Sequence, residues 1–266
     1  MSFIIDRAAV AAGLALVALT GPAVAQDASA SAPVARAVDY AQLAALPDWS
    51  GVWSIGVGGE GRRPAKPVLT PAAQARFDAF QKKQAEEGVD QFANIHCIPP
   101  GMPDIMREPY PIEIIYSPNR VTIFAETYGQ ARRIYTDGRA LPEDPDPLFN
   151  GTSVGHWEGD TLVVDTVGFN AMVELAPGVP HSGNMRIRER IWLASPDVLR
   201  IETTITDPEV LAEPLVHQST YRKQPGWEIR EYVCAENNRL VEGENGANID
   251  LGLDDEGEDP FGALPE

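Results

Sequence analysis

Two carboxylates stand on strand-like stretches of this sequence that are otherwise apolar. Asp165 shares a face with Val163 and Val167, and Glu189 alternates in step with Ile187 and Ile191. A carboxylate on an apolar face needs a partner or a chemical task, because burying an unpaired charge is costly. Burial also shifts pKa values toward those that general acid–base catalysis requires. Asp165 and Glu189 are therefore our candidates for a general base.

The matching acid would be an imidazole or a phenol. Tyr135 lies on the stretch that contains residues 132–136, and His156 lies one turn before the Asp165 stretch. If residues 159–160 form a two-residue turn, His156 falls on the face of Asp165; a three-residue turn places Trp157 there instead. His156 and Tyr135 are our candidate acids. The sequence does not determine whether the turn has two or three residues.

Other polar side chains could bind a substrate beside them. Arg133 shares one face with Tyr135, whereas Arg132 lies on the other face with Ile134 and Thr136. An arginine is the natural partner of a buried carboxylate or of an anionic substrate group, and we assign this role to Arg133. His217, on the face of Leu215, Ser219 and Tyr221, and His181, in a long loop, are further candidates. The alternative is that all of these residues are structural.

The elements that must position these side chains are strands joined by short turns. The expected strands are 112–116, 121–128, 130–136, 151–157, 161–169, 185–193, 199–206, 213–223 and 227–234. Helical crossovers for parallel pairing are absent between them. The sequence predicts a mainly β fold, an antiparallel meander closed into a lipocalin-like (calycin-type) barrel, since closure removes exposed edges. Such a barrel has room for one small ligand.

Two further elements precede these strands. Gly51-Val52-Trp53 is a strand start that resembles those of lipocalin-like barrels, in which the tryptophan fills one end. Thr70 is an N-cap residue with Pro71 at the first helical position, which predicts one short helix to about Glu87, ending at Gly88. Phe77 and Phe80 mark its buried edge.

A proline-rich loop over residues 97–111 cannot form a regular helix or a central strand. It carries Met102, Met106 and Tyr110. The loop would either roof a cavity, with Met102 and Tyr110 touching the ligand, or cover a sheet edge.

Composition divides the chain into four parts. Residues 1–25 form a secretory signal peptide, with Arg7, an apolar run and the cleavage signal Ala23-Val24-Ala25. The apolar run is too short to span a membrane, and no later segment is a candidate. Residues 26–45 are a flexible leader, residues 46–241 a single barrel domain, and residues 242–266 an acidic disordered tail. We expect a periplasmic or secreted protein.

The net charge of −18 argues against a nucleic-acid partner. Half of it lies in the tail, which either solvates the protein or docks to a basic partner. The four histidines show no zinc-ligand spacing, and phosphate-binding and nucleophile-elbow motifs are absent. We expect no metal, no cofactor and a small-molecule ligand; the oligomeric state stays open.

The two cysteines, Cys97 and Cys234, form an even pair in a chain expected to be exported, which predicts a disulfide. A bridge across so long a loop is worth ~4 kcal/mol in the chain-entropy model. It would hold the Met102 loop over one mouth of the barrel. The alternative is two thiols that never meet.

Several long motifs resemble a family of exported bacterial proteins. They are residues 49–53, 97–103, 133–139, 142–147, 150–170 and 232–237, and together they span most of the folded body. The chain is also loosely similar to the cofactor-independent lyases by which soil bacteria deformylate lignin-derived aromatic dimers. This resemblance implies an aromatic substrate and no cofactor, and it carries over no catalytic residue.

Three hypotheses follow. The first is an exported, cofactor-independent enzyme of lyase or isomerase type, acting on a small, largely apolar molecule such as an aromatic one. The second is a non-catalytic, lipocalin-like binding protein of the periplasm. An enzyme needs two or more ionisable groups within hydrogen-bond reach of one point inside the barrel, whereas a carrier needs few. The third is an envelope protein whose acidic tail carries the function.

Overall fold

The computed structural model describes residues 40–55, 66–88, 92–234, 240–243 and 246–249. All described residues belong to one compact unit. The predicted signal peptide, most of the leader and residues 250–266 of the predicted tail lie outside the described residues. In the described residues no helix is both long and apolar enough to cross a membrane.

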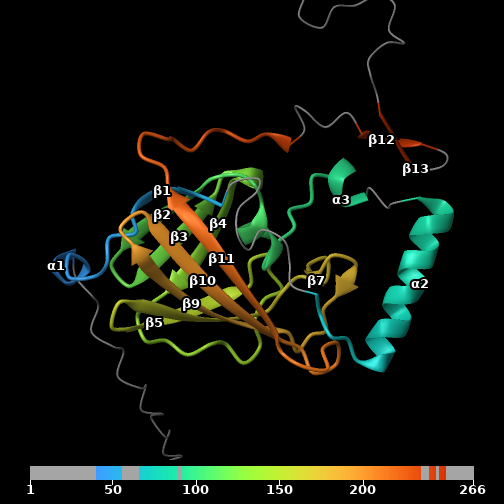
Figure 1. Ribbon diagram of the computed structural model, residues 1–266, viewed down its shortest axis with the longest axis horizontal. Helices are drawn as coiled ribbons and strands as arrows, with labels where there is room; N and C mark the ends of the chain where they lie inside the picture. Colours follow the sequence, from blue (N-terminus) through green and yellow to red (C-terminus); the bar gives the residue numbers. More distant parts are fainter. Residues whose placement is uncertain (1–39, 56–65, 89–91, 235–239, 244–245, 250–266) are drawn as a thin grey trace, which may run out of the picture. The chain divides into compact units, whose positions relative to one another are not determined.

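Nine strands of the described chain form a closed barrel in the order β1-β11-β10-β9-β6-β5-β4-β3-β2 (Figure 1). This confirms the prediction of a closed, mainly antiparallel barrel. The strands are β1 (Gly51–Ser54), β2 (Ile112–Ser117), β3 (Arg120–Ala125), β4 (Gln130–Tyr135), β5 (Thr152–Glu158), β6 (Thr161–Val167), β9 (Arg186–Ser195), β10 (Val198–Thr206) and β11 (Leu215–Lys223).

The barrel departs from the predicted meander at two joints. β4 and β5 are parallel and pair only through Ile134 opposite Ser153 and Tyr135 opposite Val154. The predicted strand 227–234 is not a strand, because the chain leaves β11 at a turn and runs on as an irregular segment. Its place beside β11 is taken by β1, with Trp53 opposite Lys223 on one side and Ile112 on the other.

The barrel interior follows from the alternation of buried and exposed residues, which is clearest in β9. In β9 the arginines 186, 188 and 190 are exposed, and the residues between them are buried. Trp53 fills the interior at the start of the chain, and its indole Nε1–H donates to the Trp49 carbonyl at 2.7 Å. The ring of Trp49 in turn packs against Trp157 of β5, with centroids 5.0 Å apart.

The predicted helix is α2 (Pro71–Glu87), and its bounds are those expected. The Thr70 hydroxyl accepts a hydrogen bond from the Ala73 backbone N–H, as an N-cap should. The remaining elements are short: α1 (Tyr40–Leu43), α3 (Phe92–Ile95), the 3₁₀ turns η1 (Asp104–Arg107) and η2 (Thr127–Gly129), the hairpin β7 (Glu174–Ala176) and β8 (Val179–Pro180), and the hairpin β12 (Leu240–Gly243) and β13 (Gly246–Ile249). β13 lies in the range predicted as the tail.

The proline-rich loop closes over the barrel interior. Met102, Ile105 and Met106 are buried in the same core cluster as the inward side chains of the strands. The hydroxyl of Tyr221, an inward residue of β11, donates to the Met106 carbonyl. Of the two alternatives, the loop therefore roofs the interior. Tyr110 turns outward instead, with its ring 5.5 Å from that of Tyr232.

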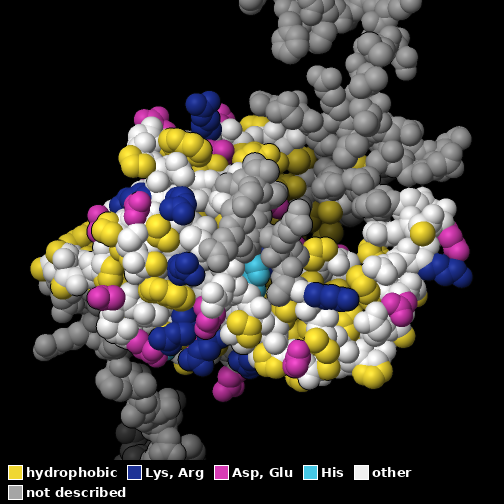
Figure 2. All heavy atoms as spheres, in the orientation of Figure 1, with side chains coloured by type: hydrophobic (Ala, Val, Ile, Leu, Met, Phe, Trp, Pro, Cys, Tyr) yellow, Lys and Arg dark blue, Asp and Glu magenta, His cyan; other side chains and the backbone are white. Residues whose placement is uncertain are grey.

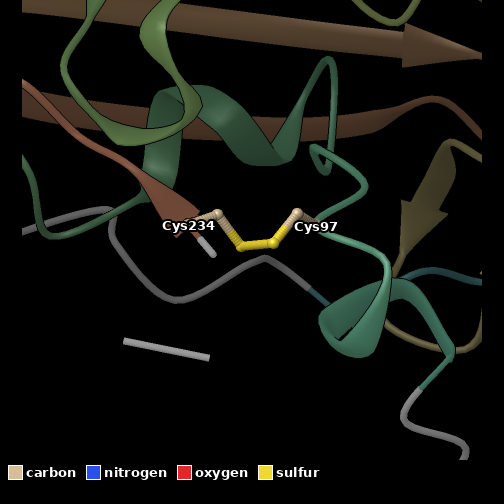
Figure 3. The surroundings of a disulfide bond; sticks show 2 residues. All are labelled: Cys97 and Cys234. Carbon is tan, nitrogen blue, oxygen red and sulfur yellow. A yellow bond between two sulfur atoms is a disulfide. The ribbon is translucent and has the colours of Figure 1, made fainter. Parts of the chain in front are cut away.

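Cys97 and Cys234 form the predicted disulfide, with Cα atoms 5.8 Å apart (Figure 3). Cys97 stands at the start of the proline-rich loop, and Cys234 ends the irregular segment that follows β11. That segment is also held by the Arg230 N–H, which donates to the Glu126 carboxylate at 2.8 Å. The bridge thus joins the roof of the barrel to the chain leaving its last strand.

Candidate functional site

The barrel interior holds a buried ion pair between Arg132 of β4 and Glu189 of β9. Their side chains are 2% and 1% exposed. Nη1 of Arg132 donates to one carboxylate oxygen at 3.1 Å, and Nη2 donates to the other. Nη2 also reaches the Thr166 hydroxyl at 3.1 Å, and the guanidinium lies 3.4 Å from the Ser153 hydroxyl. The pair is therefore bidentate, and its guanidinium is also hydrogen-bonded to two hydroxyl groups.

Glu189 confirms the prediction that this carboxylate points inward, but its partner is not the expected one. Arg132 is the inward arginine, and Arg133 is exposed on the outer face of β4. The prediction failed because each face of this short strand carries an arginine beside uncharged side chains. The pattern of charge therefore does not distinguish the two faces, and only the burial of Ile134 identifies the inner one.

His217 lies at the level of Glu189 on the barrel wall. Glu189 is opposite Thr203, and Thr203 is opposite His217, on three neighbouring strands. His217 is buried, as predicted from its face, and its Nε2 lies 3.2 Å from the Ser219 hydroxyl. Tyr221 follows on the same face, where burial raises the pKa of its hydroxyl, aided by the charge of Glu189.

A second arginine, Arg107, enters the interior from the roof. It pairs with Asp104 within η1. Burial lowers the pKa of Arg107 to about 10, against the opposing charges of Tyr221 and Glu108. The interior thus contains guanidinium, carboxylate, phenol and imidazole groups, most of which are engaged with one another.

Asp165 and His156 lie outside the barrel, which corrects the expectation that they face a cavity. The turn after β5 has two residues, so His156 does share the face of Asp165, but that face is the outer one. Asp165 is 36% exposed, with its carboxylate 3.5 Å from Arg188. His156 is 57% exposed and lies 3.3 Å from Glu158. Figure 2 shows such acidic and basic groups intermingled over the visible face of the described residues.

His181 does not lie on a strand of the barrel. It follows β8, where its two ring nitrogens contact the carbonyls of Ser182 and Asn170. Its ring meets the edge of Phe169 at 6.1 Å. Within the described chain, no hydrogen bond or ion pair joins any two of Asp165, Glu189, His156 and Tyr135. The prediction that they gather around one cavity is therefore wrong.

The wall of the barrel has a groove of about 470 Å³ beside the short parallel pair. Its lining includes Gln130, Arg133 and Tyr135 of β4, and Phe149, Asn150 and Ser153 from the chain entering β5. The volume lies within the range of small-molecule sites. Arg133 and Tyr135, both predicted as site residues, thus come together here.

The groove exists because the chain before β5 is held away from β4. The Leu148 N–H donates to the Gly168 carbonyl at 3.0 Å, and the Met102 N–H donates to the Phe149 carbonyl at 2.9 Å. These bonds tie residues 148 and 149 to the end of β6 and to the roof. The Asn150 side chain reaches back across, donating to Gln130 Oε1 at 3.2 Å. Sequence reasoning missed the groove because no pattern marked a parallel joint.

The lining suits a molecule with an acidic group and a flat apolar part. Arg133 has no carboxylate within ion-pair distance among the described residues, and a guanidinium binds carboxylate or phosphate bidentately. Tyr135 is half-buried, with Arg139 stacked 3.9 Å from its ring centroid. The Phe149 side chain packs against the core at the groove floor. At its inner end Ser153 separates the groove from Arg132.

No model of a known protein family matches the chain, and no curated protein matches it. Among solved structures, one match is the crystal structure of a secretary abundant heat soluble (SAHS) protein from Ramazzottius varieornatus. The two chains are 12% identical, with 66% of this chain and 95% of that chain covered and a TM-score of 0.31. The two structures share only a coarse likeness.

Proposed function

We propose that this protein is a barrel-based binding protein for a small, partly aromatic carboxylate, held in the groove between β4 and β5. The observation that carries this proposal is the groove itself, which brings the exposed cation of Arg133 beside Tyr135 and Phe149. Stacking on aromatic rings and a bidentate guanidinium contact would fix the two ends of one such ligand.

Binding without chemistry is favoured over an acid–base enzyme by the state of Glu189. Both of its carboxylate oxygens accept hydrogen bonds from Arg132, so a proton transfer would first have to break a buried bidentate pair. The proposed bases and acids are also spread over both faces of the wall. A lyase or isomerase working through Glu189 and His217 is the second candidate, favoured by their common level inside the barrel.

We also propose that the protein works outside the cytoplasm. The support is the Cys97–Cys234 bridge, since disulfides persist in oxidising compartments and are rare in the cytosol of mesophiles. Together with the signal peptide that the sequence predicts, this favours the periplasm or the exterior. Fractionation of cells that express the full chain would test it, and a protein retaining its first 25 residues in the cytosol would contradict it.

The binding proposal is tested on the Arg133 side chain. Calorimetric titration with benzoate and 4-hydroxybenzoate, guided by native mass spectrometry of ligands that co-purify, should give saturable binding. Arg133→Gln should weaken it at least tenfold, because a charged hydrogen bond is worth about 1.5–3 kcal/mol. Arg186→Gln is the matched control: it removes an exposed arginine on β9 that does not line the groove.

Two outcomes would overturn the proposal. One is equal affinity in the Arg133→Gln and Arg186→Gln variants. The other is conversion of the bound ligand, followed by NMR, that stops in Glu189→Gln and not in Arg133→Gln; that result would favour the enzyme instead.

A further inference from the structure

A second cavity lies beneath α2, apart from the groove. It measures about 210 Å³ and is lined both by the helix and by the hairpin of β7 and β8. Phe77 and Phe80 line it from the helix, Gly178 and Val179 from the hairpin, and Val210 from the loop before β11. None of these residues takes part in the groove, so the two sites are separate.

Among the described residues, hydrogen bonds to other elements hold the helix at its first turn only. The Thr70 N–H donates to the Val210 carbonyl at 2.9 Å, and its hydroxyl donates to the Glu209 carbonyl at 3.0 Å. Beyond this first turn α2 is mostly exposed, and Ala73 is its one buried residue among those described. The rest of its contact runs through the two phenylalanine rings, which lean on Gly178. A Cβ on Gly178 would lie 2.7 Å from the Phe80 ring, so this approach requires glycine.

The cavity is chemically suited to an uncharged ring. Its walls are aromatic and aliphatic, and the two charged groups at its edge, Arg76 and Glu174, have opposite signs. The Glu174 carboxylate already accepts the Gly178 N–H at 2.8 Å. The wall of the cavity is therefore mostly apolar, and an uncharged ring can lie against Phe77 and Phe80.

The volume of the cavity limits the size of the ligand. An apolar cavity of roughly 150 Å³ holds a benzene molecule. A cavity of about 210 Å³ therefore suits a molecule with one or two fused rings. We propose that this cavity is a second binding site, for a small uncharged aromatic molecule such as an indole, and that the bound molecule fastens α2 to the barrel unit.

The test uses 5-fluoroindole as the probe, with ¹⁹F NMR titration of the full mature chain. Ala73 is buried and lines the cavity, whereas Ala72 is exposed on the same turn of α2. Ala73→Leu should fill the space and weaken binding at least tenfold. Ala72→Leu is the matched control and should stay within twofold of the wild type, since leucine is a good helix former at both positions.

Hydrogen exchange supplies a second readout. Amides of residues 75–87 should exchange at least threefold more slowly when the probe is bound to the wild type or to Ala72→Leu. In Ala73→Leu the probe should have no effect on these amides. If circular dichroism shows that Ala73→Leu lacks its helix, Phe80→Ala replaces it; loss of the ring should then weaken binding at least tenfold.

Several results would overturn the proposal. One is the absence of saturable probe binding to the wild type, which would make the cavity an ordinary packing gap. Another is equal affinity in Ala73→Leu and Ala72→Leu. A third is loss of probe binding in Arg133→Gln, because the probe would then lie in the groove. Failure of carboxylates to bind the groove would leave this proposal unaffected. The groove proposal and the cavity proposal can therefore be disproved independently.

Discussion

Arg132 and Glu189 are each almost wholly buried, so the free energy of each depends on the other. Removing one partner leaves an unpaired charge in the core, at a cost of about 3–5 kcal/mol. Glu189→Gln and Arg132→Met should each lower the free energy of unfolding by about that amount, measured by urea titration. The double variant Arg132→Met/Glu189→Leu should recover part of the loss, because no charge remains unpaired.

The exposed pair on the outer wall is the control. Asp165→Asn breaks its contact with Arg188 in solvent and should change stability by about 1 kcal/mol or less. The Arg132→Met/Glu189→Leu variant would contradict the coupling of the two residues if its free energy of unfolding fell by the sum of the two single losses.

Tyr221 makes stability depend on alkaline pH. Burial raises the pKa of its hydroxyl above the value of about 10 that it has in the unfolded chain. Below pH 10 both states hold the proton. As pH rises past 10 the unfolded chain releases it first, so the free energy of unfolding falls. Tyr221→Phe should cost about 1 kcal/mol at pH 8, through the lost bond to Met106, and should lose less stability than wild type between pH 8 and 10.5.

Other groups also titrate in this pH range. Burial raises the pKa of Tyr116 and of Tyr128, and both stay in the variant, so the alkaline loss of stability is reduced and not abolished. Arg107, with its pKa lowered to about 10, contributes with the opposite sign in both proteins. If the urea midpoints of the two proteins fall by the same amount as the pH rises, the role assigned to Tyr221 is contradicted.

Single residues were predictable from sequence where one face of a strand was clearly charged. The arginines of β9 alternate with apolar residues, which identified Glu189 as inward. The face of Asp165 contains Val163, which is fully buried although it points away from the interior. Alternation identifies the two faces of a strand but does not say which one the core covers. For this reason Asp165 was misplaced and Arg132 was passed over for Arg133.

At the scale of elements, the roof depends on one close approach. Gly101 has a φ of +67°, and a Cβ there would clash with the Phe149 carbonyl oxygen. Gly101→Ala should therefore lower the free energy of unfolding by about 2–4 kcal/mol, from overpacking and from backbone strain together. Chemical denaturation would measure it, and proteolysis should cut residues 97–111 sooner.

Gly159→Ala is the matched control for this change. Gly159 has a φ of +59° in the β5–β6 turn, but nothing lies within 4 Å of the position that a Cβ would occupy. The backbone strain is similar, at about 1 kcal/mol, and the clash is absent. Equal losses in the two variants would show that the contact with Phe149 is unimportant.

Helix α2 and the hairpins were predictable because their signals are local. The N-cap at Thr70, the β5–β6 hairpin and the turn before β10 each involve neighbours in sequence, although the length of the turn after β5 was not determined by them. The joints that sequence reasoning missed are non-local. Nothing near Gln130 or Thr152 shows that β4 and β5 meet in parallel, and nothing near Trp227 shows that β1 occupies the place beside β11.

At the scale of the whole molecule, the disulfide joins segments 137 residues apart in sequence. Closing so long a loop restricts the unfolded chain, and its loss should cost about 2–5 kcal/mol. Reduction, or the Cys97→Ala variant, should lower the melting temperature and increase hydrogen exchange in residues 97–111 before the strands. Intact mass should differ by two hydrogens between the oxidised and reduced chains.

One observation would contradict the disulfide directly. If both thiols react with an alkylating reagent in the native protein without reductant, the bridge is not formed and the roof is held by its packing alone. Cys234→Ala should match Cys97→Ala in every measurement, because each removes the same bond.

The position of β1 has a consequence for the order of events in folding. The strand lies between β2 and β11, so the ring of hydrogen bonds cannot close until the most C-terminal strand of the barrel has been synthesised. Until β1 has paired with both of them, β2 and β11 have free edges that can pair with another copy of the chain. Contacts between the two ends of a chain also form slowly, because a long loop must be ordered first. We therefore expect closure to be the slowest step of refolding, and the aggregation-prone species to be a barrel that lacks only its first strand.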